Sequence, residues 1–309
     1  MPELPDVTVY VERTQALFAG QPLGDIRIAS PFLLRSVDPP IATARGKRLR
    51  ACRRLGKRIV WELEDDLFLV FHLMIAGRFH VRPLGAKAGG KVGLAAFDFA
   101  QSTLLLTEAS TKKRASLHVV RGETSLAGFA RGGVEVASVD TTGFAAALRR
   151  ENHTLKRALT DPDIVSGIGN AYSDEILQRA RLSPLALTSK LEDEALARLH
   201  RACQEVLGEW TARLRAEVGT GFPEQVTAFR PEMAVHGRYR QPCPTCGTAV
   251  QRIAYAENEC NYCPRCQTEG RLLADRSLSR LLKKDWPRTI DELERLRRER
   301  EVPSDARSV

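Results

Sequence analysis

The sequence predicts an α+β protein with three parts: an N-terminal antiparallel β-sandwich that includes an N-terminal helix, a helical domain, and a small C-terminal metal-binding module. Three observations predict this fold. Short β-rich segments fill the first 130 residues, long stretches of helical periodicity follow from residue 143, and five of the seven cysteines lie between positions 243 and 266. A chain of 309 residues has room for roughly two domains and a small third.

The N-terminal region, residues 1–130, is the predicted β-sandwich. Its beginning is an exception, because apolar residues recur at helical spacing between residues 5 and 19. The rest contains short segments rich in β-branched and aromatic residues, each near a turn signal. The clearest of these segments are 57–63, 67–73, 95–99 and 103–107. The apolar runs in this region are too short to cross a membrane.

A linker is predicted at residues 131–142, where two glycine-containing segments interrupt the pattern. The helical domain then spans residues 143–237. Its long helix-like stretches are residues 143–160, 170–182 and 190–218, of which the last carries a broad apolar stripe. A loop with two glycines separates the first two helices, and the final segment, 219–237, is expected to be irregular.

Residues 238–285 contain two Cys-x-x-Cys pairs separated by 16 residues. This spacing is typical of a zinc site in which four thiolates complete a tetrahedron. The predicted ligands of one Zn²⁺ are Cys243, Cys246, Cys263 and Cys266. Cys260 also precedes Cys263 by three residues, so it is an alternative partner, and a buried or redox-active dithiol is a competing interpretation. Four thiolates leave no open coordination position, so we expect a structural site.

Charge and the two ends of the sequence add further expectations. The chain carries 47 Lys and Arg against 38 Asp and Glu, a net charge of +9, which favours a polyanionic partner. Acidic residues near the start differ from a basic secretory signal, so a cytoplasmic location is expected. The tail, residues 286–309, is charged and poor in apolar residues, and it is predicted to be a marginal helix followed by disorder.

The second residue is a proline, and removal of the initiator methionine would leave a free Pro2 amine. A secondary amine can attack an aldehyde-like carbon and form an iminium, and an α-amino group titrates far below a lysine. Glu3 and Asp6 are nearby carboxylates able to move protons. Many proteins begin with Met-Pro-Glu, so this feature alone does not identify an enzyme.

Several features occur together in the order and spacing of one known family. They are Met-Pro-Glu-Leu-Pro at the start, Gly56-Lys57 before a strand, Ser166-Gly-Ile-Gly-Asn170-Ala-Tyr172 opening a helix, and the two terminal Cys-x-x-Cys pairs. Over about residues 1–270 this combination resembles the formamidopyrimidine-DNA glycosylase/endonuclease VIII family of base-excision repair enzymes.

The resemblance implies an N-terminal β-sandwich, a helix-two-turn-helix domain and a C-terminal zinc-finger hairpin, with damaged DNA as partner. It implies that Pro2 attacks C1′ of the damaged nucleotide, that Glu3 transfers the proton at the sugar ring oxygen, and that Lys57 contacts the phosphate and the lesion. The resulting Schiff base would allow strand cleavage. The family often has glutamate where this chain has Asp6, which is one methylene shorter.

The same resemblance implies DNA contacts in the helical domain. Asn170 matches the asparagine that holds the DNA backbone near the everted nucleotide, and Lys156 falls where the family also has a lysine. The alternatives are a helix N-cap for Asn170 and a solvated strand residue for Lys57. An everted nucleotide is required because a stacked base cannot be attacked at C1′ from this side.

The sequence departs from the family at three places that concern the substrate. Asn258 stands where the zinc-finger hairpin usually has an arginine. The family often fills the gap left by the everted base with a methionine from one loop and an arginine–phenylalanine pair from another. In this chain Met74 is displaced and Ile75 lies at the usual place of the methionine, while Arg114 is present without the phenylalanine. Residues 219–237 do not resemble the loop that caps 8-oxoguanine in some members, so the preferred base stays open.

We therefore expect a monomeric, non-membrane DNA repair glycosylase with abasic-site lyase activity. The alternative is a non-catalytic protein of the same fold that binds damaged or unusual DNA, which the changes at Asn258 and in the gap-filling loops favour. A zinc-ribbon module that binds RNA or is associated with transcription is a third class, but it would not explain Pro2 and Glu3.

Overall fold

The structure, a computed structural model, describes residues 1–255, 258–274, 281 and 286–301. Two compact units are present. The first contains residues 1–138, 161–169 and 207–228, and the second contains residues 139–160, 170–206 and those from 229 onward. In the described ranges, no helix is both long and apolar enough to cross a membrane.

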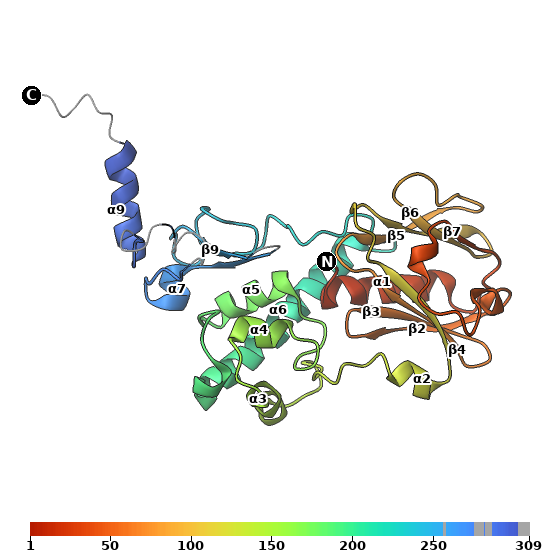
Figure 1. Ribbon diagram of the computed structural model, residues 1–309, viewed down its shortest axis with the longest axis horizontal. Coiled ribbons are helices and arrows are strands. Elements are labelled where there is room, and N and C mark those ends of the chain that lie inside the picture. Colours follow the sequence, from red (N-terminus) through yellow and green to blue (C-terminus); the bar gives the residue numbers. More distant parts are fainter. Residues whose placement is uncertain (256–257, 275–280, 282–285, 302–309) are drawn as a thin grey trace, which may run out of the picture. The chain divides into compact units, whose positions relative to one another are not determined.

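The first unit contains helix α1 (Leu4–Phe18), two antiparallel four-stranded sheets and the short helix α2 (Glu123–Ala127) (Figure 1). One sheet has the order β1-β6-β7-β5, made of β1 (Ile26–Ile28), β6 (Gly93–Asp98), β7 (Ser102–Glu108) and β5 (Gly77–Pro83). The other has the order β2-β3-β4-β8, made of β2 (Leu49–Leu55), β3 (Arg58–Leu63), β4 (Leu67–His72) and β8 (Ser116–Arg121).

An aromatic cluster joins the two sheets into a sandwich. The Trp61 ring of β3 lies edge-on to Phe97 of β6, with centroids 5.2 Å apart, and Phe71 of β4 lies edge-on to Phe79 of β5 at 5.3 Å. Tyr10 of α1 contacts Phe79 at 5.8 Å. Burial of these large rings is the main stabilising contribution of this unit, at roughly 25 cal/mol per Å² of apolar surface removed from water.

The predicted N-terminal helix and the four predicted strands are confirmed, with boundaries within a few residues. Four further strands, β1, β2, β5 and β8, were not predicted. In β5 the alternation of Phe79 and Val81 with charged neighbours is a strand signal that sequence reasoning missed. The sequence of β2, LRACRRL, is too basic to stand out as a strand.

Two segments that follow the sandwich in sequence nevertheless pack with it. In the first, Val134 pairs with Val165 in a parallel bridge, and the Leu4 N–H donates to the Gly167 carbonyl at 2.9 Å. In the second, Arg215 forms an ion pair with Glu12. The predicted domain boundaries at residues 131, 143, 238 and 286 stay predictions.

The second unit contains the helices of the middle region and the cysteine module. Its helices are α3 (Thr141–Arg149), α4 (Leu155–Thr160), α5 (Asn170–Arg179), α6 (Asp193–Val218, which continues into the first unit), α7 (Pro264–Thr268) and α9 (Ile290–Glu301). Strands β9 (Gln251–Ala254) and β10 (Glu259–Tyr262) form an antiparallel hairpin between α6 and α7. Residues 302–309, where disorder was predicted, lie outside the described residues.

The prediction of one continuous helix over residues 143–160 was wrong. The helix α3 begins at Thr141, because the Asp140 side chain caps it by accepting from the Gly143 N–H at 2.7 Å. The helix then stops at Arg149, and α4 starts at Leu155. Between them the backbone pairs with residues 186–188 instead of continuing the helix.

Candidate active site and metal centre

The Glu3 carboxylate is the best-defined functional group near the N-terminus. Its residue is 2% exposed, and its Oε2 accepts from the Gly169 N–H at 2.6 Å. The neighbouring Pro2 is also buried. The turn before α5 therefore positions a carboxylate directly beside the predicted nucleophile, within the first unit.

The close approach of this turn to Glu3 requires glycine. A Cβ at position 169 would lie 2.6 Å from both Cδ and Oε1 of Glu3, far inside van der Waals contact. Gly167 has a φ of +80°, in the left-handed region that favours glycine. Glycine is therefore required at the two positions for different reasons: at 169 because a side chain would clash with Glu3, and at 167 because of the backbone conformation.

Asp6 holds the start of α1. Its Oδ2 accepts from the Glu3 N–H at 3.0 Å, and Glu3 and Asp6 form a reciprocal capping box. Pro5 lies in the first turn, where its missing N–H costs nothing. The helix start therefore orients Glu3 through its backbone as well as through Gly169.

Lys57 lies in the turn between β2 and β3, after Gly56 with a φ of +60°. Burial lowers the pKa of the Lys57 ammonium, and the Glu3 carboxylate acts in the opposite direction. Burial also lowers the pKa of the chain's terminal amine; Glu3 opposes this effect and Arg78 adds to it. The structure therefore brings Pro2, Glu3 and Lys57 into one electrostatic environment.

A partly buried network that the sequence did not reveal fixes the glycine turn. The Ser166 hydroxyl donates to the Glu135 carboxylate, which is also paired with Arg54 of β2. Arg54 Nη1 donates in addition to the Gly56 carbonyl at 2.9 Å, next to Lys57. Residues 54 and 135 are far apart in sequence and each looks like an ordinary surface charge, so no local signal could have found this link.

Lys156 is bound within the second unit. Its Nζ donates to the Asp174 carboxylate at 2.5 Å and to the Asn170 carbonyl at 2.7 Å. Asp174 is fully buried, and its other oxygen accepts from the Asn261 N–H and lies 2.8 Å from His236 Nδ1. This arrangement joins α4, α5 and the hairpin, and sequence reasoning missed Asp174. A DNA contact by Lys156 stays a prediction.

Asn170 and Asn258, two predicted DNA contacts, differ in exposure. The Asn170 side-chain amide donates to the Glu259 carbonyl of β10 at 3.0 Å, and the residue is only partly exposed. Asn258 is exposed just before β10, and its carbonyl accepts from the Tyr255 N–H at 2.7 Å. The roles of both residues in DNA binding stay predictions.

The gap-filling candidates lie on loops at one end of the sheet β2-β3-β4-β8. Met74 has a φ of +52° and is half-buried beside His72, whereas Ile75 is 53% exposed. Arg114 is exposed just before β8. Of the two apolar side chains, Ile75 is therefore the one presented to solvent.

The four predicted cysteine ligands come together. The sulfur atoms of Cys243, Cys246, Cys263 and Cys266 all lie within 4.8 Å of one another. A tetrahedral zinc with bonds of about 2.3 Å requires sulfur–sulfur separations of about 3.8 Å, so this donor set fits the ion. Cys260 is buried and is not part of the cluster. The structure thus supports the 263/266 pair over the alternative with Cys260.

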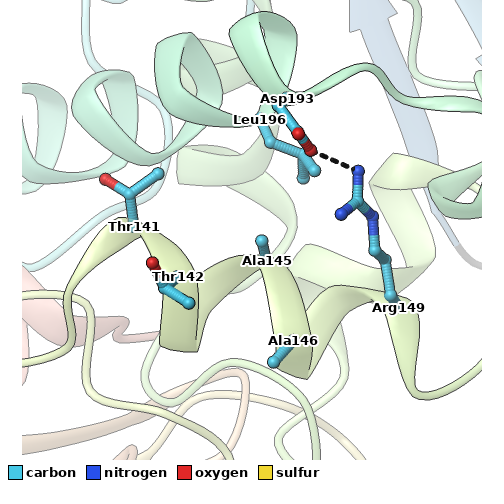
Figure 2. A pocket seen from close by; sticks show the side chains of 7 residues that line it. All are labelled: Thr141, Thr142, Ala145, Ala146, Arg149, Asp193 and Leu196. Carbon is cyan, nitrogen blue, oxygen red and sulfur yellow. Dashed lines mark hydrogen bonds and ion pairs between the residues drawn. The ribbon is translucent and has the colours of Figure 1, made fainter.

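A pocket of about 440 Å³ lies between α3 and the start of α6. Figure 2 shows the Arg149–Asp193 ion pair, 2.7 Å long, at one side of it. Thr141, Ala145 and Leu196 contribute to its remaining wall. None of the predicted site residues lines this pocket, so it belongs to neither the candidate active site nor the metal centre.

Comparison with known proteins identifies the family. Models of the formamidopyrimidine-DNA glycosylase N-terminal domain and H2TH domain match residues 1–146 and 134–217. A formamidopyrimidine-DNA glycosylase of Thermus thermophilus is 33% identical over 277 residues, covering 87% of this chain and all of the relative. The chain belongs to the formamidopyrimidine-DNA glycosylase family, as the resemblance predicted.

Other similar proteins agree with this assignment. An uncharacterized formamidopyrimidine-DNA glycosylase-like protein of Mycobacterium tuberculosis is 41% identical over 151 residues, which is 49% of this chain and 94% of the relative. The Lactococcus lactis Fpg bound non-covalently to AP-site DNA has a TM-score of 0.75 at 25% identity, covering 86% of this chain and 99% of that one. The predicted fold class, with antiparallel sheets, an H2TH domain and a cysteine cluster, is confirmed.

Proposed function

We propose that this DNA glycosylase removes damaged bases and then cleaves the resulting abasic site, with the Pro2 amine as nucleophile. One observation carries the proposal: a buried carboxylate, Glu3, is held by the Gly169 N–H directly beside Pro2. A carboxylate held in place on the residue next to the nucleophile is suited to proton transfer on the same sugar. The L. lactis relatives were solved with abasic-site and oxidized-pyrimidine DNA, which agrees with this substrate class.

The surroundings of the N-terminus support a neutral amine. Removal of Met1 would leave Pro2 as a secondary α-amine, which ordinarily titrates near 8. Burial lowers the pKa of the terminal amine at Met1, one residue away, and Arg78 and Lys57 act in the same direction against Glu3 and Asp6. Pro2 is itself buried, so the same effects would act on its nitrogen.

The proposed chemistry moves protons at each step. The Pro2 nitrogen bonds to C1′ while the bond from C1′ to the base breaks, and the departing base takes up the proton that the nitrogen loses. The nitrogen lone pair then opens the sugar ring as Glu3 gives a proton to O4′. The resulting iminium acidifies the C2′ proton, whose loss expels the 3′ phosphate; a second elimination expels the 5′ phosphate.

The remaining predicted residues would hold the DNA. Lys57 is half-buried beside Glu3 and would contact the phosphate next to the lesion, while Asn170 would contact the backbone from the second unit. The net charge of +9 supports binding that weakens with salt. A monomer acting in the cytoplasm is part of the same proposal.

Zinc would be held by Cys243, Cys246, Cys263 and Cys266, whose thiolates fit a tetrahedral ion. Bound there, it supplies structure and no reactive position. The apolar core around the cluster is small, with Val235 and Val250 as its main members, so metal binding would contribute much of the folding energy of this module.

Borohydride trapping on abasic-site DNA tests the proposal. The processed protein should become covalently linked to the DNA, and a variant with a blocked N-terminus should bind DNA without being trapped. Glu3→Gln should lower base excision by roughly 10²–10⁴-fold while still reacting with a preformed abasic site. Trapping of the blocked protein would exclude Pro2 and direct suspicion to Lys57. DNA binding without any trapping would favour the non-catalytic alternative.

A further inference from the structure

The sheet β2-β3-β4-β8 brings several loops to one end. Arg58, next to Lys57, pairs with His72, and His72 pairs with Ser116. Beyond β8 one more segment lies alongside the sheet, because Leu34, which follows the short 3-10 helix Pro31–Leu33, forms a parallel bridge with Leu117. The lateral order at this end is therefore the Lys57 turn, the loop with Ile75, the loop with Arg114, and finally residues 31–35.

Phe32 is the most exposed aromatic ring of this segment. It is 72% exposed, whereas the next residue, Leu33, is buried in the core. The segment is tied to β8 because the Arg35 N–H donates to the Leu117 carbonyl at 2.9 Å and the Ser36 hydroxyl accepts from the Val119 N–H at 2.7 Å. A ring held out from a well-anchored loop contributes little to folding and is available to a partner.

Two arginines lie near the segment of Phe32. Arg35 follows it along the chain, and the bridge between Leu34 and Leu117 brings the segment next to the start of β8, shortly after Arg114. Both Arg35 and Arg114 are exposed, and neither guanidinium has an acidic partner within the described ranges of the chain. The Arg114 loop is fixed because the buried Glu108 carboxylate accepts from the Arg114 N–H at 2.9 Å.

The distance between the Phe32 ring and the candidate active site indicates which partner could reach both. Three interstrand steps, from β3 through β4 and β8 to the segment of Phe32, amount to roughly 14 Å. A DNA strand advances 3.4 Å per nucleotide, so this ring lies about four nucleotide steps away from a nucleotide held at Lys57. An exposed aromatic ring flanked by unpaired cations is suited to stacking on nucleic-acid bases while the cations contact phosphates.

We propose that Phe32, together with Arg35 and Arg114, forms a second DNA contact, which we call the Phe32 tip. The Phe32 ring inserts between stacked bases of the duplex beside the lesion and partly unstacks them, and the two arginines bind the adjacent phosphates. The everted nucleotide stays at Pro2 and Lys57, so the tip recognises the duplex and not the damaged base. This inference rests on the proposed function, because it takes the position of the lesion from it.

A binding experiment tests the tip without any catalysis. The DNA is a duplex with a stable abasic-site analogue, and 2-aminopurine is placed in turn at each position flanking the analogue. The unmodified protein should raise the fluorescence at one position several steps from the analogue. Phe32→Ala should remove that signal and weaken binding roughly 5- to 140-fold, whereas Phe32→Trp should keep it. Leu84→Ala, which removes another exposed apolar side chain, is the matched control and should behave like the unmodified protein.

The arginines and a single-stranded substrate give independent readouts. Arg35→Gln and Arg114→Gln should each lower the slope of log affinity against log salt by about 0.9 on duplex DNA. On a single strand that contains an abasic site, borohydride should trap Phe32→Ala to the same extent as the unmodified protein, because the tip has no duplex to bind.

The outcomes separate the two hypotheses. If the unmodified protein is not trapped but the fluorescence signal depends on Phe32, the proposed chemistry fails and the tip stands. If trapping succeeds while Phe32→Ala binds the duplex as the Leu84→Ala control does, the tip is overturned and the proposed function stands.

Discussion

The substitution Gly169→Ala tests whether the placement of the Glu3 carboxylate decides the rate of base excision. The new Cβ would lie 2.6 Å from Glu3 Oε1. Ordinary contact begins at about 3.4 Å, so the carboxylate must move by roughly 0.8 Å. Because Glu3 is 2% exposed, the surrounding side chains leave it little room for this movement.

The expected effect on catalysis follows from this displacement. A misplacement of about 1 Å at a reacting group can lower a rate by roughly 10²-fold. The shift also stretches the 2.6 Å hydrogen bond between the Gly169 N–H and Glu3, and an unsatisfied buried N–H costs about 1–3 kcal/mol. We therefore expect base excision to fall about 100-fold and the free energy of unfolding to decrease by about 1–3 kcal/mol.

Single-turnover excision on a lesion duplex and urea unfolding measure the two effects. Gly208→Ala is the matched control, because a Cβ at that position in α6 meets nothing within 4 Å. It should leave excision unchanged and stabilise the helix by about 0.5–1 kcal/mol. If Gly169→Ala excises the base at the rate of the unmodified protein, the reasoning is refuted, because the position of the Glu3 carboxylate would then not limit the rate.

Three further changes have defined outcomes. Cys246→Ser should release the zinc measured by metal analysis, whereas Cys260→Ser should retain one zinc per chain; loss of metal from the latter would contradict the cluster of four cysteines. Lys156→Ala leaves the buried Asp174 carboxylate without its ammonium partner and should lower the free energy of unfolding by about 3 kcal/mol in urea, whereas unchanged stability would mean that water reaches that carboxylate. Burial, aided by neighbouring cations, lowers the pKa of the His72 imidazole from 6.5 to about 4. As the pH falls from 6.5 to 4, the unfolded chain therefore takes up a proton at His72 before the folded chain does, and the free energy of unfolding decreases. The loss attributable to His72 is at most about 3 kcal/mol, and His72→Gln should remove it when unfolding is compared at pH 7 and pH 4; an unaltered pH dependence would assign the effect to other groups.

Much of the candidate site was predictable because its chemistry is local in sequence. Pro2 and Glu3 are adjacent, and the two Cys-x-x-Cys pairs predict a site of four thiolates from their spacing. The choice of Cys266 over Cys260 was open in the sequence, since both lie three residues from Cys263. It was decided by the fold, which buries Cys260 away from the cluster.

Other parts of the site could not be predicted because they depend on pairs distant in sequence. The Arg54–Glu135 pair, which anchors the turn at Ser166, joins residues 81 positions apart. Lys156 has the sequence position of a DNA contact, yet its ammonium lies against Asp174. A charged side chain looks the same in sequence whether it faces solvent or a buried partner, because burial is a property of the packed chain.

The sequence by itself determined the elements whose stability comes from neighbours along the chain: the apolar stripe of α1, the alternating strands of the sandwich, and the cysteine spacing of the candidate metal centre. Only the tertiary structure decided which segments pack together. Residues 161–169 and 207–228 follow the sandwich in sequence yet belong to its compact unit, and only there does Gly169 meet Glu3. The physical reason is that periodicity reports which face of an element is apolar, whereas the partner that covers this face is chosen by burial and hydrogen bonding across the whole chain.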